Sequence, residues 1–467
     1  MSLVLCGPPA AGKTTLARRL DPAAVDADER VEQALGEPIA AFWDREGEAA
    51  FRAREEAVVL ELLREGHAVL ALGGGAVESE RVRAALRDHV VALVDVDREV
   101  AWARASADPA RPLGRDRAAF DARLDARAPL YAEVAALRLL WGRHPVWVGP
   151  VGLPPWPATG RRLVVSDEHV VEALGVVVPD PAGLVEIEAG EAHKTLATCE
   201  RVWQALVEQG ATRADHVVAL GGGVVGDLAG FVAATYQRGI PVVQVPTTLV
   251  AMVDSAIGGK TGVDLPRAKN MVGAYHQPAG VLVDPAHLRT LPPEELAAGF
   301  AEVVKTALIA GGALWERVRG GATVDEDVIV GCIRTKLAVV DEDERDGGRR
   351  QVLNLGHTVG HAIEAATGFT RLRHGEAVGL GLLAALELSG QPALRDEVAA
   401  LLRAAGLPTT IGGVDPEEVV ALTARDKKRT GAEVPFVLVD APGRVRHGCA
   451  VDGAAVLAAV RGVASAA

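Results

Sequence analysis

A glycine-rich turn and two lysines fall within one short stretch of the chain. The stretch reads GGGVVGD over residues 221–227 and VDSAIGGKTGVDLPRAKN over residues 253–270, with Lys260 and Lys269 inside the second part. A Gly-rich turn after an apolar strand lets backbone N–H groups approach a pyrophosphate closely. Lysines bind anions as point charges. The pattern therefore predicts a dinucleotide cofactor beside a phosphorylated substrate.

A second phosphate-binding pattern opens the chain. GPPAAGKT, at residues 7–14, satisfies G-x-x-x-x-G-K-[ST] between the apolar run LVLCG and the run GKTTLARRL. In a strand–loop–helix context, N–H groups at the helix N-terminus hold phosphate oxygens. Lys13 then reaches the β and γ oxygens, and the Thr14 hydroxyl binds Mg²⁺. The motif predicts nucleotide binding but names no acceptor.

Alternating strand and helix signals place both motifs in parallel sheets. HAVLALGGG and HVVALVDVD predict strands in residues 1–140, and RRLVVSD, DHVVALGGG and IPVVQVPTT predict strands in residues 161–285. From about Leu291, apolar residues recur at three- and four-residue spacing. We therefore expect an α/β protein with a doubly wound P-loop domain at 1–143, a Rossmann-like α/β domain at 144–286 and an all-α domain at 287–467.

The boundary between the first two domains has two interpretations. Residues 149–160, GPVGLPPWPATG, are dense in Pro and Gly and are typical of a linker. Alternatively, HPVWVGPVGL already holds the first strand of the second domain. We favour the second interpretation, which places the boundary near residues 141–145.

Composition and charge exclude several classes of function. The 467 residues are 49 % hydrophobic, and 62 acidic against 49 basic residues give a formal net charge of −13. That balance argues against nucleic-acid binding, which needs a basic face. The four cysteines form no metal-type pair, and no apolar segment is long enough to cross a bilayer. We expect a cytoplasmic protein with small-molecule substrates and neither a nucleic-acid nor a membrane partner.

Residues 1–134 resemble shikimate kinase. The resemblance is carried by VDADERVEQALGEPIAAFWDREGEAAFRAREE, LALGGG, RPL and RAPLY. It implies phosphorylation of shikimate with ATP and Mg²⁺, with Asp26 near the magnesium ion that Thr14 binds. The nucleotide contacts it implies are Gly7, Gly12, Lys13, Thr14, Thr15, Arg104 and the lid arginine Arg111. The shikimate contacts it implies are Asp28, Arg52, Gly73, Gly74, Gly75 and Arg127.

These residue types suit the chemistry of a hydroxyl acceptor. Two arginines can form charge-assisted hydrogen bonds to a carboxylate, and Asp28 can orient the attacking hydroxyl and accept its proton. One departure concerns the end of the domain, where shikimate kinases add a strand, an adenine-contacting loop and a last helix. Here ALRLLWGRHPVWVG follows directly. Two hypotheses follow, an active kinase with altered adenine binding or a binding-only or structural module.

Residues 145–440 resemble 3-dehydroquinate synthase almost continuously. GEAHKT, GGGVVGD, PTT, VDSAIGGKTG, AKN, LRTLP, AEVVK, NLGHTVGH, HGEAVGLG and DKK occur in family order. The resemblance implies an NAD-binding domain followed by a helical domain that binds zinc (or cobalt) and substrate. It also implies a homodimer through the synthase domains. The NAD contacts it implies are Gly190, Glu191, Lys194, Gly223, Gly226, Asp227, Thr247, Thr248, Lys269 and Thr290.

A divalent metal would be held by one carboxylate and two imidazoles. Spacing alone leaves the choice open, because His357 and His361 are i and i+4 on one helix face and both could be ligands. The resemblance assigns zinc to Glu302, His357 and His374 and keeps His361 as a catalytic or second-shell histidine. Such a set with open positions for substrate oxygens fits catalytic zinc.

The remaining residues that the resemblance implies surround the anionic substrate. A phosphate and a carboxylate on one small sugar acid require several cations. The set is Asp254, Lys260, Lys305, Lys336, Arg350, Asn354, Lys427, Asn270 and Arg238, the last from a partner subunit. Ala268 stands where the family usually has Gly, and Asp346 where Glu is common. We expect both departures to be tolerated.

The implied substrate is 3-deoxy-D-arabino-heptulosonate 7-phosphate. The implied reaction is oxidation at C5 by NAD, β-elimination of phosphate, return of the hydride, ring opening and an aldol closure to 3-dehydroquinate. The leading hypothesis is thus a bifunctional enzyme of the shikimate pathway and aromatic amino-acid biosynthesis. The alternatives are a synthase with a degenerate kinase domain, another sugar-phosphate cyclase, and a metal-dependent dehydrogenase, against which the lysine-rich segment speaks.

Overall fold

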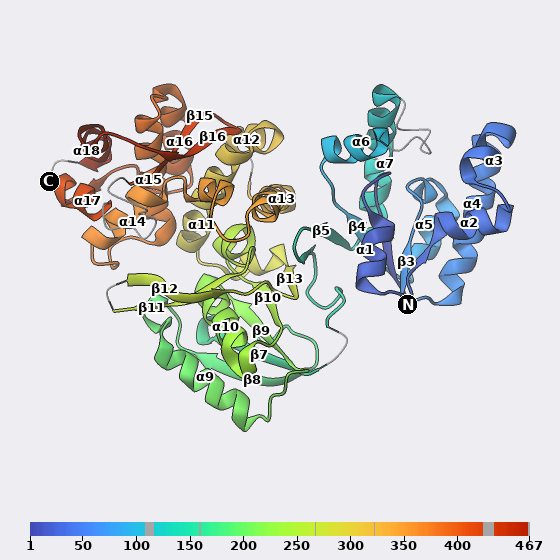
Figure 1. The fold of residues 1–467 in the computed structure, drawn as a ribbon, viewed down its shortest axis with the longest axis horizontal. Helices are drawn as coiled ribbons and strands as arrows, with labels where there is room; N and C mark the ends of the chain where they lie inside the picture. The colour runs from blue at the N-terminus through green and yellow to red at the C-terminus, as the bar shows by residue number, and fades with distance from the viewer. Residues whose placement is uncertain (108–115, 158–159, 267, 322, 424–433, 466–467) are drawn as a thin grey trace. The chain divides into compact units, whose positions relative to one another are not determined.

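The structure is a computed structural model that describes residues 1–107, 116–157, 160–266, 268–321, 323–423 and 434–465. Its contacts divide the chain into two units (Figure 1). The N-terminal unit comprises Met1–Leu140 and Val146–Trp156, and the C-terminal unit comprises Trp141–Pro145 and Pro157–Ala467. Most of the stretch expected to begin the second domain therefore groups with the N-terminal unit, while residues 141–145 group with the C-terminal one. The three domain ranges given above remain a prediction.

Strands of a mostly parallel sheet form the centre of the N-terminal unit. Their order is β2 (Val25–Asp26), β3 (Val69–Ala71), β1 (Leu3–Cys6), β4 (Val90–Val94), β5 (Leu137–Trp141) and β6 (Pro145–Val148). β1 pairs in parallel with β3 and with β4, and β4 pairs in parallel with β5. The apolar runs LVLC and VVALV are buried, as strands of a sheet covered on both faces require. The three strands predicted here are confirmed.

Seven helices belong to this unit in the part of the chain that is described. They are α1 (Lys13–Leu20), α2 (Ala27–Leu35), α3 (Ile39–Glu46), α4 (Glu48–Glu65), α5 (Glu80–Leu86), α6 (Arg98–Ser106) and α7 (Arg117–Val134). The apolar-patterned run EEAVVLELLREG, which begins at Glu55, lies at the C-terminal end of α4, seven residues after the helix begins. Between Leu137 and Pro157 the chain forms the strands β5 and β6 and no helix. The structure therefore lacks, between residues 137 and 157, the last helix with which shikimate kinases are expected to end.

Five parallel strands form the centre of the first half of the C-terminal unit. Their order is β13 (Gly280–Val283), β10 (Val242–Pro246), β9 (His216–Gly221), β7 (Arg162–Asp167) and β8 (Pro181–Ile187), all pairs being parallel. The helices α8 (Glu168–Leu174), α9 (Leu196–Glu208) and α10 (Gly223–Thr235) accompany it. The predicted strands are confirmed, whereas β8 and β13 had no expectation of their own.

A long antiparallel hairpin leaves this sheet between β10 and β13. It consists of β11 (Lys260–Leu265) and β12 (Ala268–Tyr275), in the segment that carries both motif lysines. Before it, the turn η5 (Ala251–Ser255) is a π-helix, a conformation that is frequent at functional sites. The two lysines predicted to bind anions thus lie on a hairpin and not on a helix.

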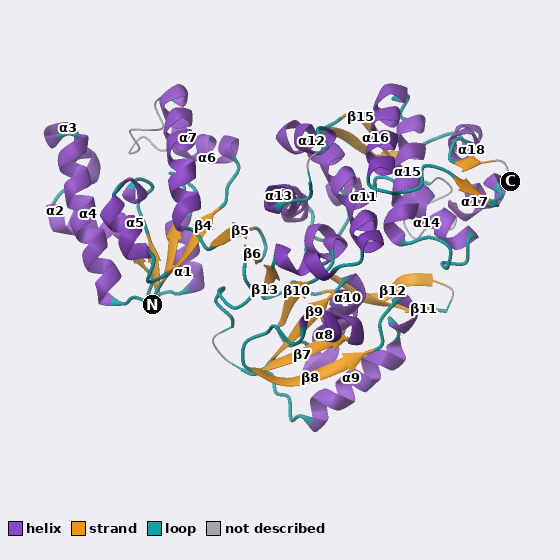
Figure 2. Cartoon of the chain, turned by 180° about the vertical axis from the view of Figure 1, so that it is seen from behind, coloured by secondary structure: helices purple, strands orange, loops and turns teal. Residues whose placement is uncertain are grey.

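Helices form most of the second half. They are α11 (Pro293–Ala310), α12 (Gly312–Arg319), α13 (Glu326–Glu342), α14 (His357–Ala366), α15 (His374–Leu388), α16 (Pro392–Ala404), α17 (Pro416–Thr423) and α18 (Gly453–Arg461), drawn in purple in Figure 2. The helical character is confirmed. Two small sheets also occur, β15 (Phe436–Ala441) with β16 (Arg444–Cys449) and β14 (Ile411–Gly412) with β17 (Ala464–Ser465). FVLVDA is β-branched and is followed by a turn at Pro442 and Gly443, where φ is 82°, which suits a hairpin.

Within the described residues, no helix is both long and apolar enough to span a membrane.

Candidate active sites

A cavity of about 1730 Å³ opens in the C-terminal unit. It lies where the carboxyl ends of β9 and β10 face the hairpin β11–β12 and the helices α11, α13, α14 and α15. Ligands bind at this end of parallel strands in open α/β sheets. The predicted residues that line it are Gly190, Glu191, Lys194, Gly223, Asp227, Thr247, Thr248, Asp254, Lys260, Lys269, Asn270, Thr290, Glu302, Lys336, Arg350, Asn354, His357, His361 and His374.

Close helix packing brings the candidate metal ligands together. A Cβ atom on Gly375 would lie 1.9 Å from the carbonyl oxygen of Ala298, so α15 reaches α11 only because residue 375 is glycine. A Cβ atom on Gly381 would likewise lie 1.9 Å from the carbonyl oxygen of Gly356, which precedes α14. These contacts bring three helices side by side, one turn from Glu302.

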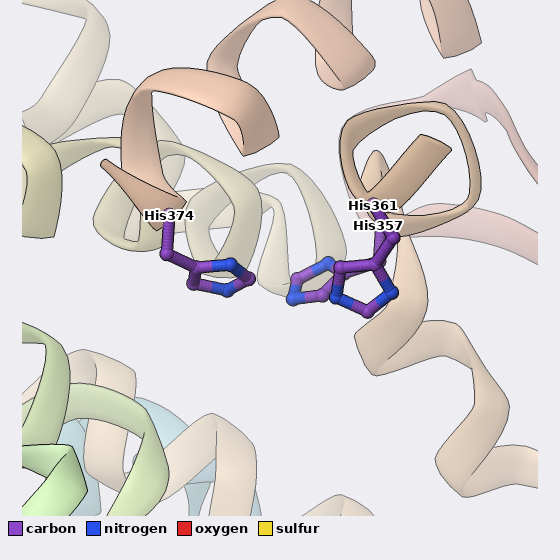
Figure 3. Close-up of side chains that lie close together, drawn as sticks. All are labelled: His357, His361 and His374. Atoms are coloured by element: carbon purple, nitrogen blue, oxygen red, sulfur yellow. The ribbon is translucent and has the colours of Figure 1, made fainter. Parts of the chain in front are cut away.

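Three imidazoles point into the space between α14 and the first residue of α15 (Figure 3). One ring nitrogen each from His357, His361 and His374 lies within 4.8 Å of the other two. Oε1 of Glu302 lies 3.6 Å from Nε2 of His357 and 3.5 Å from Nε2 of His374. The structure therefore gathers four donors, and Glu302 faces the two histidines assigned to zinc.

The donor set fits a divalent ion. Ligand atoms at ~2.1 Å from one zinc ion in a tetrahedral site lie ~3.4 Å from one another. The two Glu302–histidine separations are close to this value and too long for good hydrogen bonds. Neighbouring groups also orient the rings, because Nδ1 of His357 lies 3.2 Å from the carbonyl oxygen of Leu355 and Nδ1 of His374 faces the charge of Glu364, with Oε2 at 3.5 Å. Such partners leave the Nε2 atoms for the metal.

A buried chain of alternating charges continues from the metal-type cluster. Lys305 lies 2.5 Å from Oε2 of Glu302 and donates to Oδ2 of Asp254 at 2.7 Å, and Lys336 donates to Oδ1 and the carbonyl oxygen of Asp254. Lys305 and Glu302 are each 1 % exposed. Burial disfavours ionised carboxylates, but Lys305 and His357 lower the pKa of Glu302 to about 2. Burial and the charges of Lys305 and Arg350 lower the pKa of Lys336 to about 8, despite Asp254.

Hydrogen bonds to neighbouring groups hold Arg350 and Lys260, two of the residues predicted to bind substrate anions. Arg350, 1 % exposed, donates through Nη2 to the carbonyl oxygen of Gly258 at 2.9 Å and through Nη1 to that of Glu344. Lys260 donates to Oδ2 of Asp346 at 2.7 Å. Asp346 has φ 63°, a conformation in which Asp is enriched, so the departure from Glu is accommodated. Ala268 has no positive φ, so its position does not require the usual glycine.

The dinucleotide-type turn lies between β9 and α10. A Cβ atom on Gly222 would lie 2.9 Å from Thr248 Cγ2, and one on Gly223 would lie 3.1 Å from Ser255 Oγ. The glycines thus keep space free at the N-terminus of α10, where a pyrophosphate is favoured. Lys194 contacts Asp227 at 3.2 Å and Glu191 at 3.0 Å. Burial raises the pKa of Asp227 to about 6, although Lys194 opposes the shift.

Three predicted residues do not line the cavity, and one lies beyond the description. Gly226 faces Gln244 inside α10, and Lys305 lies beneath the cavity wall, where it joins Glu302 to Asp254. Arg238 is exposed with φ 69° and is absent from the wall of its own cavity. Lys427 lies outside the described residues, as does Arg111 of the N-terminal unit.

The N-terminal unit holds the predicted phosphate loop between β1 and α1. Lys13 donates to the carbonyl oxygens of Gly7 at 3.0 Å and Pro8 at 2.9 Å, so its ammonium lies over the loop. Thr14 donates to Oδ2 of Asp26, which joins the two residues assigned to magnesium. Gly12, the N-cap of α1, has φ 90° and lies near Arg104. Thr15 is the third residue of α1.

The predicted shikimate contacts also converge. A Cβ atom on Gly73 would lie 2.5 Å from both Asp28 Oδ1 and Glu55 Oε1, and one on Gly75 would lie 2.1 Å from Arg52 Nη1. Arg127, 2 % exposed, bonds Oε1 of Glu78 through Nε at 2.9 Å. Its Nη2 has no hydrogen-bond partner among the described residues. A buried guanidinium with a spare donor fits a carboxylate ligand. The adjacent Gly74 carbonyl accepts a bond from Tyr131 at 2.6 Å.

Sequence reasoning missed two buried carboxylates. Glu55 contacts Arg52 at 2.5 Å, and burial raises its pKa in spite of that arginine. Glu364 contacts Lys269 and His374, both at 3.5 Å. Each lies three residues after a predicted site residue, Arg52 or His361, and that helical spacing was the available signal.

Comparisons with known proteins identify a family for each of the two parts of the chain. Residues 184–298 match the 3-dehydroquinate synthase N-terminal family, and residues 299–429 match its C-terminal family. The chain is 44 % identical to 3-dehydroquinate synthase of Symbiobacterium thermophilum over 334 residues, which cover 65 % of this chain and 93 % of that protein. The chain belongs to the 3-dehydroquinate synthase family. It is also 45 % identical over 311 residues to the synthase of Gloeobacter violaceus, covering 62 % and 86 %. Residues 9–145 match the shikimate kinase family, so a kinase domain precedes the synthase.

Solved structures resemble the synthase part in fold. The 2-epi-5-epi-valiolone synthase of Streptomyces hygroscopicus subsp. jinggangensis 5008, with NAD⁺ and Zn²⁺ bound, has a TM-score of 0.63 at 28 % identity and covers 68 % of this chain and 96 % of its own. A 2-deoxy-scyllo-inosose synthase with NAD⁺, Co²⁺ and carbaglucose-6-phosphate has a TM-score of 0.59 at 24 % identity, covering 69 % and 98 %. The second likeness concerns the fold alone.

Proposed function

We propose that this chain catalyses two reactions of the shikimate pathway. The synthase part converts 3-deoxy-D-arabino-heptulosonate 7-phosphate to 3-dehydroquinate and phosphate, and the kinase domain phosphorylates shikimate with ATP. The observation that carries the first assignment is one cavity that joins a Gly-rich dinucleotide turn, a Glu–His–His metal set and a cluster of cations.

The relatives support the heptulosonate substrate over other cyclitol precursors. The 3-dehydroquinate synthases are 44 % and 45 % identical to this chain, whereas the valiolone and inosose synthases are 28 % and 24 % identical. The carboxylate of the heptulosonate adds an anion to the phosphate. A cavity lined by Lys260, Lys336 and Arg350 suits a substrate with two anionic groups.

NAD and zinc (or cobalt) supply hydride transfer and polarisation of the reacting hydroxyl when they are bound. Glu302, His357 and His374 would hold the metal. The turn at Gly222 and Gly223 would hold the pyrophosphate, with Asp227, Glu191, Lys194 and Lys269 around the cofactor. Gly190, Thr247, Thr248 and Thr290 complete that wall.

The chain's own groups would orient the substrate and move protons. Lys260 and Arg350 bind anionic oxygens at one end, and Asn354 and Asn270 offer hydrogen bonds to hydroxyls. His361, whose ring centroid lies 5.2 and 5.7 Å from those of His357 and His374, would exchange protons with the substrate, while the other two histidines bind the metal. Lys305, at 2.5 Å from Oε2 of Glu302, holds this carboxylate in its charged form.

In the kinase domain, Lys13 and the loop amides would bind the phosphates of ATP, with Mg²⁺ at Thr14 and Asp26. Asp28 would orient the shikimate hydroxyl, and Arg52 and Arg127 would bind the carboxylate. The second candidate, a kinase domain that only binds or supports, is favoured by the strand β6, which follows β5 where an adenine loop and a last helix are expected.

We further propose that the chain is a cytoplasmic homodimer in which Arg238 serves the partner subunit. The exposure of Arg238 and its absence from its own cavity wall support this arrangement. All four cysteines are free, which suits a reducing compartment.

Phosphate release tests the synthase assignment. The purified chain should release phosphate from the heptulosonate phosphate only when both NAD and a divalent metal are present. Release that persists without NAD, or its absence with both, would refute the assignment.

A further inference from the structure

Residues 141–145 form a short segment that groups by its contacts with the C-terminal unit, although residues 1–140 before it and 146–156 after it belong to the N-terminal unit. A Cβ atom on Gly142 would lie 2.9 Å from Oδ1 of Asp341, at the end of α13. Nη1 of Arg143 lies 3.3 Å from Oε2 of Glu344. The segment therefore packs against the end of α13 and against the loop that follows it.

His144 is the buried residue of this segment. It is 2 % exposed, and its Nδ1 lies 3.1 Å from Oε1 of Gln277. Its Nε2 has no hydrogen-bond partner among the described residues. The contact with Gln277 is therefore the one side-chain hydrogen bond of His144 among the described residues. Burial, together with the charges of Lys336 and Arg350, lowers the pKa of His144 to about 4.

Gln277 continues the contact into the synthase. Its Nε2 donates to Oε1 of Glu344 at 2.9 Å and lies 3.5 Å from the carbonyl oxygen of Gly258. These acceptors require the amide NH₂ on their side, so Oε1 faces His144 and accepts from Nδ1–H. The neutral imidazole of His144 thus donates to Gln277, and Gln277 in turn donates to Glu344.

The same two residues, Gly258 and Glu344, also accept hydrogen bonds from the active-site arginine. Arg350 donates to the carbonyl oxygen of Gly258 at 2.9 Å and to the backbone oxygen of Glu344. Arg350 lines the cavity, whereas Gln277 and Glu344 do not. Gly258 also lies two residues before Lys260. A change at His144 would therefore reach the anion-binding end of the site through Gln277.

We infer that His144 is a positioning residue of the synthase: it fixes Gln277 and, through Gly258 and Glu344, the guanidinium of Arg350 that binds the anionic end of the substrate. The inference rests on the proposed role of Arg350 in the synthase. It gives residues 141–145 a function in the synthase site.

The variants separate positioning from folding. His144→Leu removes the donor at similar volume, and His144→Asn restores an N–H group near the place of Nδ1. Gln277→Leu breaks the next link. His216→Leu is the matched control, because His216 is also buried but begins β9, whose other end, Gly221, lies five residues or ~17 Å away along the strand.

The readouts are the dissociation constant of inorganic phosphate, by calorimetry on the full chain with zinc and NAD, and the KM and kcat for the heptulosonate phosphate. We expect His144→Leu to raise the phosphate dissociation constant and KM by about tenfold, as partial loss of one charge-assisted hydrogen bond would. We expect kcat to change less than KM, and His144→Asn to recover most of the affinity. Adding Gln277→Leu to His144→Leu should cost little more.

Two results would overturn the inference. One is unchanged phosphate affinity in His144→Leu, and the other is an equal loss in His216→Leu, which would indicate general loosening. Calorimetry reports on this even if the wild-type chain binds phosphate without turnover, a result that would refute the proposed synthase activity alone.

Discussion

Nε2 of His374 lies 3.5 Å from Oε1 of Glu302, although the two residues are 72 positions apart in the sequence. The same carboxylate oxygen lies 3.6 Å from Nε2 of His357. The other oxygen of Glu302 contacts Lys305 at 2.5 Å. One buried carboxylate therefore divides its two oxygens between a metal-type cluster and a lysine, which keeps it charged for binding a cation.

Zinc content should separate the two histidines of α14. His357→Ala removes a proposed ligand, so we expect the purified variant to lose most of its zinc. His361→Ala should retain zinc and turn over at least tenfold more slowly, because it would lose proton transfer rather than metal binding. Metal analysis of both variants decides, and equal zinc loss from the two would contradict the assignment of His357 over His361.

Asp254 should be a large contributor to stability. Asp254→Asn leaves the buried ammonium groups of Lys305 and Lys336 without their shared carboxylate. Removing one partner of a buried ion pair typically costs about 3–5 kcal/mol in the free energy of unfolding. Denaturant unfolding at fixed zinc and NAD measures it. Asp440→Asn, which breaks an exposed pair with Arg446, should change little. Similar values for the two variants would argue against a buried charge network.

Synthase kcat/KM should fall as pH rises through about 8. The pKa of Lys336 is lowered to about 8, because burial and the charges of Lys305 and Arg350 disfavour its ammonium form. Below that pH Lys336 is charged and binds substrate anions. Well above it, the fraction of charged Lys336 falls tenfold for each pH unit. kcat should hold to higher pH, since bound anions raise the pKa in the complex. Lys336→Met should show a low kcat/KM without this decline. A wild-type profile that stays flat to pH 9.5 would contradict the role of Lys336.

The kinase domain should phosphorylate shikimate despite its altered ending. Lys13, Thr14, Asp28, Arg52 and Arg127 converge in the described part of the domain, and the adenine ring is remote from the transferred phosphoryl group. We therefore expect a raised KM for ATP more than a lowered kcat. Lys13→Ala, expected to lose activity on the order of a hundredfold or more, is the blank. Shikimate 3-phosphate no higher than this blank at saturating ATP would leave the domain a structural role.

Much of the fold could be predicted from sequence because its signals are local. The strands at residues 162–167, 216–221 and 242–246 are apolar runs bounded by turns, and all three are confirmed. The hairpin β11–β12 could not be predicted in the same way. Its residues alternate irregularly around Gly262 and Gly273, where a Cβ atom would lie 2.7 and 2.1 Å from backbone oxygens of the opposite strand. That pairing depends on a cross-strand approach that no local pattern reports.

The candidate site likewise contains residues that local motifs predict and residues that only the folded chain reveals. The residues of the quoted motifs reach the cavity because motifs keep neighbours in sequence together. Glu55 and Glu364 lie in ordinary helix positions, and their burial against Arg52 and His374 comes from tertiary packing. The link from His144 to Gln277 spans 133 residues, so only the folded chain brings its two ends together.

The stoichiometry of phosphate and NADH tests the central claim most directly. The purified chain, with zinc and NAD at a small fraction of the heptulosonate phosphate concentration, is followed for released phosphate and for absorbance of NADH. A synthase returns its hydride within each turnover, so we predict many phosphates released per NAD, 3-dehydroquinate as product and no accumulation of NADH. One NADH formed per substrate consumed, with the reaction stopping when NAD is exhausted, would contradict the account and indicate a dehydrogenase.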